Sequence, residues 1–366
     1  MGSSLDNVEI RVAVIGGGNI GTQFACLCSS KGFKVNVHTS RPYEYDGELE
    51  IVDDNGRITT GKPDLITNDI GKAVSGCDVI FVTHPAFKLK ETADNIMPYI
   101  NKNIKIVVIP GTGGAEFSFY DCVKAGATLY GLQRVPSVAR LEKYGKRVRC
   151  EGLREKLHIS SFPLSDSREI SGLLEYIFGI PCEILPNYLC VTLTPSNPIL
   201  HTTRLCTLFS DYYEGKVYSQ NPLFYGEWSD RSSELLLACD EELQQICKYV
   251  NNMDLTSVRS LKLHYESNTI YDMTKKIRSI SSLHNLRSPM IRVENGWIPD
   301  FHSRYFTADF PYGLAIIEEL AEIVGCNVPN INSTMDWYRK KTNDYNRLDL
   351  KQYGICSLEN IYMYYM

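Results

Sequence analysis

The stretch Val12-Ala13-Val14-Ile15-Gly16-Gly17-Gly18-Asn19-Ile20-Gly21 decides how the chain begins to fold. Its apolar residues have the length and β-branched character of a buried strand. A segment with helical spacing follows, and after it comes a second apolar run, Val35-Asn36-Val37-His38. The sequence therefore predicts a strand, a glycine turn, a helix and a second strand, the beginning of a βαβ unit.

The glycines follow a G-x-G-x-x-G pattern at the position where that pattern binds a dinucleotide. Gly16 permits the tight turn, Gly18 lets the backbone approach a pyrophosphate, and Gly21 lets the helix pack close to the strand. Asn19 and Ile20 open the helix, whose free N–H groups and positive dipole end attract phosphate. We predict that these five residues bind a dinucleotide; the alternative is a glycine-rich turn without a ligand.

Composition and charge narrow the class of protein. The chain has 366 residues, enough for two domains, and its formal net charge is −5 without a basic stripe, which argues against nucleic-acid binding. No apolar run approaches the ~20 residues that cross a membrane, and the first apolar run is already the first strand rather than a signal segment. The twelve cysteines are scattered along the chain and form neither a C-x-x-C motif nor a pattern with the spacing of metal ligands. We therefore expect reduced thiols, a protein without a metal site, and a cytoplasmic location.

Strand and helix signals alternate through the first half of the chain. Further strands are expected at residues 65–67, 79–83, 105–109 and 128–132, and helices at residues 87–100 and 116–125. This alternation predicts a doubly wound (Rossmann) parallel sheet over residues 1–187. Ligands of such sheets bind outside the carboxyl ends of the strands, so His84 and Gly113, in loops that follow two strands, are expected to line the cofactor crevice. For His84, ordinary turn chemistry is the alternative.

The sequence pattern changes near residue 188, where strand and helix signals no longer alternate and long amphipathic stretches begin. Helices are expected at residues 200–213, 233–250, 270–283, 312–324 and 333–341. The sequence therefore predicts an all-α domain over residues 188–366, which would carry the substrate and the catalytic groups.

The end of the second strand bears on the type of nicotinamide cofactor. NAD-binding units usually place an acid there to bind the ribose 2′-hydroxyl, but this chain has Thr39-Ser40-Arg41 and no carboxylate before Glu44. Two hydroxyls and a guanidinium suit a 2′-phosphate, since arginine binds phosphate through charge-assisted hydrogen bonds. We expect NADP to be preferred over NAD; alternatively, Arg41 only stacks on adenine or faces solvent.

Two polar segments of the second half supply the groups that a dehydrogenase needs. Such an enzyme needs a proton donor beside the carbon that accepts hydride and a cation for a substrate carboxylate. The first segment runs from Thr194 to His201 and contains Asn-Pro-x-x-His, and the second, residues 304–313, reads Arg-Tyr-x-x-x-Asp-x-Pro-x-Gly.

The order of the glycine loop and these two segments resembles the octopine/nopaline (opine) dehydrogenase family, over nearly the whole chain. Pro110-Gly111-Thr112-Gly113-Gly114-Ala115 and Val135-Pro136-Ser137-Val138-Ala139-Arg140 are also similar to family segments. The resemblance implies an oxidoreductase that joins the amino group of an amino acid to a 2-keto acid such as pyruvate and reduces the imine with NAD(P)H. It also implies a homodimer through the helical domain.

The resemblance also implies roles for single residues. His201 matches the catalytic histidine of the family, Asp309 the carboxylate that pairs with it, and Arg304 the arginine that binds substrate. Asn197 and Tyr305, in the same two segments, are expected to contact substrate. Imidazole exchanges protons near neutral pH, and a carboxylate on its second nitrogen fixes its tautomer, so the residue types fit these roles.

Other interpretations stay open at this point. His201 could be a core histidine, Asp309 a helix cap and Arg304 a partner in a structural ion pair. The sequence also departs from many relatives at Ala308, where they carry a second acid, and His302 is a second histidine near Arg304. Two other functions remain: a 2-keto-acid reductase of the ketopantoate type, and a non-catalytic NADP(H)-binding regulator.

Overall fold

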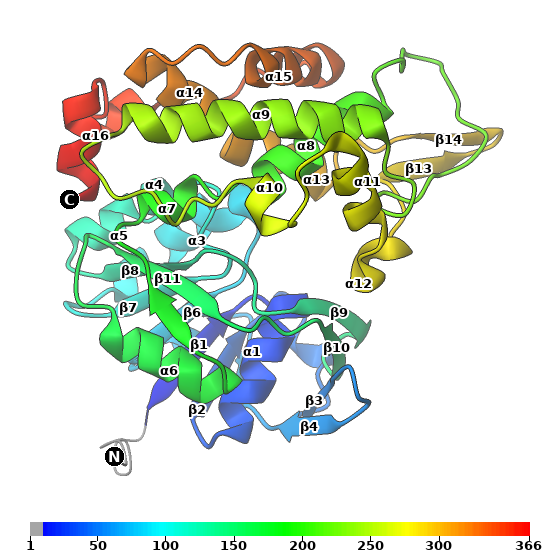
Figure 1. Cartoon of the computed structure of the whole chain (residues 1–366). Coiled ribbons are helices and arrows are strands. Elements are labelled where there is room, and N and C mark those ends of the chain that lie inside the picture. Colours follow the sequence, from blue (N-terminus) through cyan, green and yellow to red (C-terminus); the bar gives the residue numbers. More distant parts are fainter. Residues whose placement is uncertain (1–9) are drawn as a thin grey trace. The chain divides into compact units, whose positions relative to one another are not determined.

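The computed structural model describes residues 10–366, so the first nine residues of the predicted first domain lie outside the described part. The chain divides into two compact units, Met1–Val191 and Thr192–Met366. The first unit is built on a mixed sheet covered by helices, and the second is predominantly helical (Figure 1).

An eight-stranded sheet forms the centre of the first unit, in the order β12-β11-β8-β7-β6-β1-β2-β5. Its strands are β1 (Arg11–Ile15), β2 (Lys34–His38), β5 (Leu65–Thr67), β6 (Val79–Val82), β7 (Lys105–Val108), β8 (Thr128–Leu132), β11 (Leu157–Phe162) and β12 (Cys182–Ile184). From β5 to β8 all neighbours are parallel, and the order is that of dinucleotide-binding sheets. The predicted Rossmann fold class is confirmed. The sheet is not wholly parallel, however, because β11 runs antiparallel to β8.

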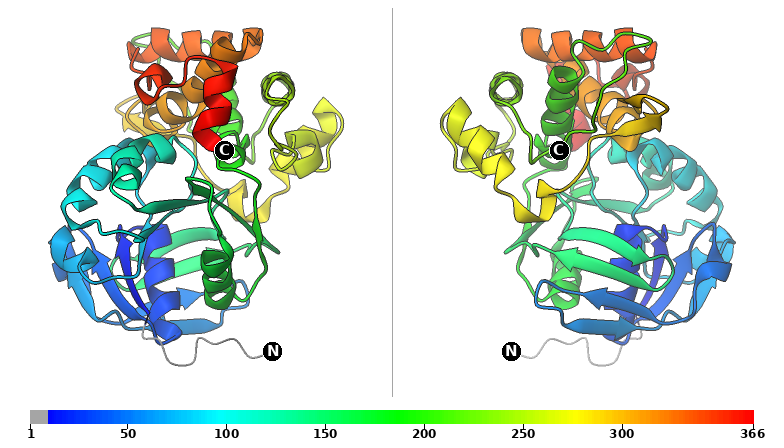
Figure 2. Two further views of the ribbon diagram at one scale, coloured as in Figure 1. Left: turned by 90° about the vertical axis from the view of Figure 1, so that its left-hand side faces the viewer. Right: turned by 90° about the vertical axis from the view of Figure 1, so that its right-hand side faces the viewer.

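Helices cover both faces of this sheet (Figures 1 and 2). On one face lie α1 (Asn19–Ser30) and α6 (Arg168–Phe178), which meet at Phe24 and Phe178 with ring centroids 5.1 Å apart. On the other lie α2 (Ile70–Val74), α3 (Leu89–Ile96), α4 (Ala115–Ser118) and α5 (Tyr120–Lys124), with the 3-10 turns η2 (Ala86–Lys88) and η3 (Met97–Tyr99) at the ends of α3. The single helix predicted at residues 116–125 is thus two short ones. Burial of the apolar strands between two layers of helices explains their continuous Val and Ile runs.

A second, four-stranded sheet in this unit escaped prediction. It consists of β3 (Leu49–Val52), β4 (Ile58–Gly61), β9 (Val138–Lys143) and β10 (Arg147–Glu151), in the order β4-β3-β10-β9. Strand β10 alternates buried and partly buried residues, and both β9 and β10 carry charged side chains, so neither of these strands shows a continuous apolar run. The thiol of Cys26 on α1 donates to the carbonyl of Leu49 at 3.3 Å, which fastens this sheet to the first helix.

The second unit is helical, as predicted, with one addition. Its helices are α8 (Ser196–Leu208), α9 (Asp230–Tyr249), α10 (Leu261–His264), α11 (Ile270–Arg278), α12 (Ser281–His284), α13 (Arg304–Thr307), α14 (Ala315–Val324), α15 (Pro329–Thr342) and α16 (Leu358–Tyr365). The second unit also contains the 3-10 turn η5 (Leu350–Tyr353) and the π-turn η4 (Phe310–Leu314). The short helix α7 (Leu189–Thr192) lies where the two units join in the chain, and the 3-10 turn η1 (Pro42–Glu44) belongs to the first unit. The addition is the hairpin of β13 (Met290–Val293) and β14 (Gly296–Pro299). The helix predicted at residues 270–283 is two helices, and the one predicted at 200–213 ends at Leu208.

Three chemical properties of residues 10–366 bear on the expectations from composition. All twelve cysteines are free thiols. No helix in this part of the chain is long and apolar enough to span a bilayer. Within the same residues, no three His, Cys, Asp or Glu side chains gather closely enough to hold a metal ion.

Candidate active site

The glycine turn has the geometry that a pyrophosphate requires. Gly16 adopts a φ of +112°, which favours glycine, and its N–H donates to the carbonyl of His38 at 3.0 Å. A Cβ on Gly21 would lie 1.6 Å from the Gly16 carbonyl oxygen, whereas one on Gly18 would meet no atom within 4 Å. Helix α1 starts at Asn19 without a side-chain cap. No N-cap side chain therefore occupies the first N–H groups of the helix, and the turn fits a dinucleotide phosphate.

These two glycines give a prediction that separates folding from binding. Gly21→Ala is expected to lower the melting temperature by roughly 5 °C or more, because the clash costs about 2 kcal/mol and a unit of this size loses ~2–4 °C per kcal/mol. Gly18→Ala is expected to leave the melting temperature unchanged and to weaken NADPH binding about tenfold, since its Cβ occupies space needed by the phosphates. Thermal melts with and without NADPH measure both. Equal melting temperatures for the two variants without cofactor would contradict this account of the turn.

Gly17 also has a structural requirement, which the sequence pattern did not reveal. A Cβ there would lie 2.5 Å from the Tyr45 hydroxyl and 2.8 Å from the hydroxyls of Thr39 and Tyr144. Tyr144 lies in the turn between β9 and β10, and its ring meets that of Tyr45 edge-on at 5.7 Å. The second sheet thus brings Tyr144 to the glycine turn, where it meets Tyr45 from the segment that follows η1. Since that sheet was not predicted, neither were these tyrosines.

The residues after β2 are arranged differently from the expectation. Thr39 is buried, and its hydroxyl bonds with that of Tyr144 at 2.5 Å, so it is already engaged, whereas Ser40 is exposed. The guanidinium of Arg41 lies 3.7 Å from the Tyr144 ring centroid and contacts both carboxylate oxygens of Glu44, at 3.2 and 3.3 Å. Arg41 and Ser40 remain available at the surface, but Arg41 must share its charge with Glu44.

His84 and Gly113 follow β6 and β7, at the carboxyl edge of the sheet. A Cβ on Gly16 would lie 3.1 Å from the His84 ring, so this histidine borders the glycine turn. Its Nδ1 bonds with the hydroxyl of Thr92 at 2.7 Å, and burial lowers the pKa of His84 to about 4, which keeps it neutral at physiological pH. Gly113 has a φ of +83° in the loop that precedes α4.

In the second unit, the structure brings His201 and Asp309 together. His201 lies on α8 and is 9% exposed, and Asp309 directly precedes η4. The two side chains meet with His201 Nδ1 and Asp309 Oδ2 2.8 Å apart. The Asp309 side chain makes no capping hydrogen bond to η4. Its contact with the imidazole therefore replaces the helix-cap alternative, and the carboxylate holds a hydrogen on Nδ1.

Aromatic rings enclose the imidazole. The ring of Tyr305 lies 4.7 Å from that of His201, and Phe224 lies 5.7 Å from His201 and 5.1 Å from Tyr305. Tyr225 adds a polar contact, because its hydroxyl is 2.8 Å from His201 Nε2. From the sequence, Tyr225 is one of several tyrosines of this domain that could wall a substrate pocket; it lies in a loop 24 residues after His201, and no motif marks its contact with the imidazole.

Arg304 and Asn197 are exposed residues near this pair. Arg304 opens α13 with its guanidinium carbon 5.7 Å from the Tyr305 ring centroid, and it has no carboxylate partner among residues 10–366. The ion-pair alternative therefore lacks a partner within the described chain. Asn197 precedes His201 by four residues on α8, so both lie on the same side of that helix. His302 is exposed and makes only a backbone bond to Asp300, so it is not part of the cluster.

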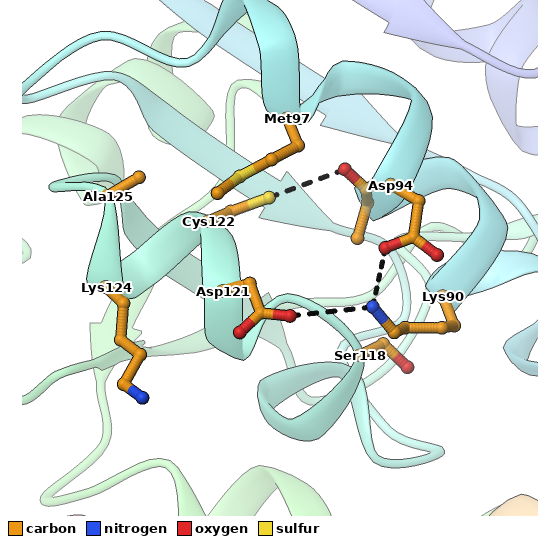
Figure 3. Close-up of a pocket in the computed structure, with 9 residues that line it drawn as sticks. Lys90, Asp94, Met97, Ser118, Asp121, Cys122, Lys124 and Ala125 are labelled. Atoms are coloured by element: carbon orange, nitrogen blue, oxygen red, sulfur yellow. Dashed lines mark hydrogen bonds and ion pairs between the residues drawn. The ribbon is translucent and has the colours of Figure 1, made fainter.

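Two surface cavities do not coincide with these residues. One, of about 370 Å³, lies between α3 and α5 (Figure 3), where Lys90 pairs with Asp94 and Asp121 at 2.5 and 3.6 Å. The other, of about 640 Å³, lies beside α14 and α15, where Arg339 pairs with Glu318 and Arg347 with Glu322. Neither contains a predicted site residue, and their named charges are neutralised locally.

Comparison with known proteins follows the division of the chain. Residues 184–342 match the family model described as NAD/NADP octopine/nopaline dehydrogenase, alpha-helical domain. Residues 11–114 match the N-terminal model of NAD-dependent glycerol-3-phosphate dehydrogenase.

Among relatives, octopine dehydrogenase of Mizuhopecten yessoensis is 26% identical, with 91% of this chain and 90% of the relative covered. Tauropine dehydrogenase of Arabella iricolor is 25% identical, with 90% and 91% covered. A solved structure of octopine dehydrogenase with NADH and L-arginine superposes with a TM-score of 0.83, at 24% identity, over 96% of this chain and 97% of that one. This last likeness establishes the shared fold.

Proposed function

Because the chain belongs to the octopine/nopaline dehydrogenase family, we propose that it is an opine-type dehydrogenase, which condenses an amino acid with a 2-keto acid such as pyruvate and reduces the product with NAD(P)H. The observation that carries this proposal is the partly buried His201–Asp309 pair, near an arginine without a carboxylate partner in residues 10–366. The enzyme is an oxidoreductase acting on CH–NH donors.

The residues of the second unit would perform the proton chemistry and hold the keto acid. The amino group adds to the keto carbon, water leaves, and the resulting imine is reduced. His201 is the source of the proton that the departing oxygen takes up, and Asp309 stabilises the charge that the imidazole carries before that transfer. Arg304 binds the keto-acid carboxylate through two parallel hydrogen bonds, with Asn197 and Tyr305 beside it, and so orients the reacting carbon. When bound, the reduced nicotinamide cofactor supplies the hydride.

The first unit would bind that cofactor through Gly16, Gly18, Asn19, Ile20, Gly21, Thr39, Ser40, Arg41, His84 and Gly113. The glycine turn serves NAD and NADP alike, since both carry the pyrophosphate. Arg41 and Ser40 support a preference for NADP, whereas Glu44 opposes it, because a carboxylate beside a 2′-phosphate repels it.

Exchange of two side chains tests the cofactor preference. Arg41→Ala is expected to raise the KM for NADPH about tenfold and to leave the KM for NADH within twofold, because one charge-assisted contact to phosphate is worth roughly 1.5 kcal/mol. Glu44→Gln, the matched variant, should lower the KM for NADPH, since it releases Arg41 from its ion pair. Steady-state rates with each cofactor measure both. Equal losses for NADPH and NADH in Arg41→Ala would remove the 2′-phosphate from this site.

Product analysis tests the reaction itself. The full chain is incubated with NADPH, pyruvate and a pool of amino acids, and the products are identified by mass spectrometry. We expect an N-carboxyalkyl amino acid, formed only when both substrates are present. Consumption of NADPH with the keto acid alone would indicate a reductase of the ketopantoate type, and binding without turnover for any keto acid would indicate a regulator.

We further assign residues 1–187 to cofactor binding and residues 188–366 to substrate binding and catalysis. A cytoplasmic location fits the twelve free thiols, because reducing conditions preserve them. The homodimer through the helical domain stays a prediction.

A further inference from the structure

Both ring nitrogens of His201 are engaged within the second unit. Nδ1 faces Asp309 Oδ2, and Nε2 faces the hydroxyl of Tyr225, each at 2.8 Å. A neutral imidazole has one N–H and one lone pair. Since the carboxylate accepts from Nδ1, the lone pair of Nε2 accepts the Tyr225 proton, and in the imidazolium form Nε2–H donates to the tyrosine oxygen. The group with which Nε2 can exchange a proton in this arrangement is therefore the Tyr225 hydroxyl.

Tyr225 is held in this place by a buried arginine from the helix that carries His201. Arg204 follows His201 by three residues on α8 and is 3% exposed. Its Nε donates to the carbonyl of Phe224 at 3.0 Å and its Nη2 to that of Glu227 at 2.8 Å. These two carbonyls flank Tyr225 in the chain, so a single helix fixes both the imidazole and the loop that brings the hydroxyl to it.

The Tyr225 ring also stacks on a tryptophan that lies beside the Arg204 guanidinium. The Tyr225 ring is nearly parallel to that of Trp228, at 14° and 6.4 Å, and the Arg204 guanidinium lies 5.5 Å from the Trp228 ring. Burial lowers the pKa of Arg204 to about 10, which still leaves it charged at neutral pH, with the Phe224 and Glu227 carbonyls around it. The Tyr225–His201 contact is thus built into the packing of α8 against this loop.

The surroundings of the hydroxyl connect it to the proposed substrate site. The charged and titratable groups that interact with Tyr225 are His201, Tyr305, Tyr265, Asp309 and Arg304. Tyr305 and Arg304 are the residues assigned above to the keto acid. Burial raises the pKa of Tyr225, so its hydroxyl remains protonated at neutral pH. The Tyr225 hydroxyl can therefore give its proton to substrate only while it receives another proton from His201.

We propose that Tyr225 is the catalytic residue that exchanges the proton with substrate, and that His201 supplies the proton to it. The proposal rests on the opine-type reaction proposed above. In the dehydration step, the Tyr225 O–H bond breaks as its proton goes to the departing substrate oxygen. At the same time the proton of His201 Nε2 moves to the tyrosine oxygen, so that tyrosine is regenerated, neutral imidazole remains and water leaves. Arg204 is a positioning residue.

The first test is Tyr225→Phe in the full-length enzyme with its cofactor. The phenylalanine ring can keep its stacking on Trp228, so we expect the melting temperature to change by only a few degrees and the KM values to change by less than threefold. In contrast, kcat should fall about 10²-fold, which is the lower end of the range for general acid catalysis. The control is Tyr212→Phe, at a half-buried tyrosine outside the cluster, which should retain full activity. A kcat equal to that of the wild type in Tyr225→Phe overturns the proposal, because His201 would then reach substrate directly.

A second variant separates proton transfer from a structural role of the hydroxyl. Tyr225→3-fluorotyrosine keeps the hydroxyl but makes it more acidic. Activity should return, and the alkaline limb of kcat against pH should move to lower pH, since the other groups around Tyr225 are unchanged. Recovered activity with an unmoved limb overturns the proposal and assigns a structural role to the hydroxyl. Failure of the opine reaction itself is distinguishable, because the wild type would then form no condensed product.

Discussion

His201→Ala is expected to lower kcat about 10³-fold, with smaller changes in the KM values for both substrates. The imidazole is hydrogen-bonded to Tyr225 and is the proposed source of its proton, and general acid–base catalysis contributes typically 10²–10⁴-fold. The loss should fall on kcat because the side chain is assigned to proton transfer, whereas Arg304 and its neighbours are assigned to substrate binding. Steady-state kinetics with NADPH, pyruvate and the amino acid identified by product analysis measure the effect.

The matched control is His302→Ala, which removes an exposed histidine two residues before Arg304. We expect it to have wild-type kinetics, because only the His302 backbone makes a hydrogen bond, to Asp300. NADPH binding by His201→Ala should also be unchanged, since the glycine turn belongs to the other unit. If His201→Ala retained more than a tenth of the activity, the imidazole would be a core residue rather than a catalyst.

Arg304→Gln is expected to lower kcat/KM for the keto acid about 10³-fold, mainly through a higher KM. Two charge-assisted hydrogen bonds to a carboxylate contribute roughly 1.5–3 kcal/mol each, and glutamine retains one uncharged donor. The guanidinium is exposed and has no carboxylate partner among residues 10–366, so its removal should hardly change the melting temperature.

Comparison of the two substrates makes this prediction specific. The KM for the amino acid should rise far less than that for the keto acid, because the arginine is assigned to the keto-acid carboxylate. As a control, Arg292→Gln removes an arginine of the same unit that lies on the β13–β14 hairpin, and it should leave both KM values unchanged. A parallel rise of both KM values in Arg304→Gln would assign the arginine to a general attraction for anions.

Sequence patterns predicted the parts of this protein that depend on local or repeated features. The strand before Gly16 and the strand Val79–Val82 are buried on both faces, and such strands show as continuous apolar runs. The glycine turn is local in sequence, and Gly21 must be glycine because the Gly16 carbonyl oxygen leaves no room for a Cβ. The pairing of His201 with Asp309 spans 108 residues, and only resemblance to a family suggested it.

The parts that escaped prediction depend on contacts between distant segments without a motif. Tyr144 reaches Thr39 across 105 residues through a small sheet of alternating polarity, and nothing near Tyr144 signals that contact. Tyr225 reaches His201 because Arg204 binds carbonyl groups, which have no signature in a sequence. The pairing of Arg41 with Glu44 is close in the chain, yet it required the 3-10 turn η1 to bring the two side chains together.

The proposed proton chain lies within one unit of the molecule, Thr192–Met366. This unit contains Asp309, His201 and Tyr225, and also Arg204, which positions Tyr225. The glycine turn and Arg41 belong entirely to the other unit. Cofactor preference and proton transfer can therefore evolve separately. Substitutions in the first unit that change the preferred nicotinamide cofactor can accumulate without altering the residues of the proposed proton chain. A chimaera that joins the first unit of an NAD-specific relative to residues 192–366 of this chain should change its reductant and keep its choice of amino acid.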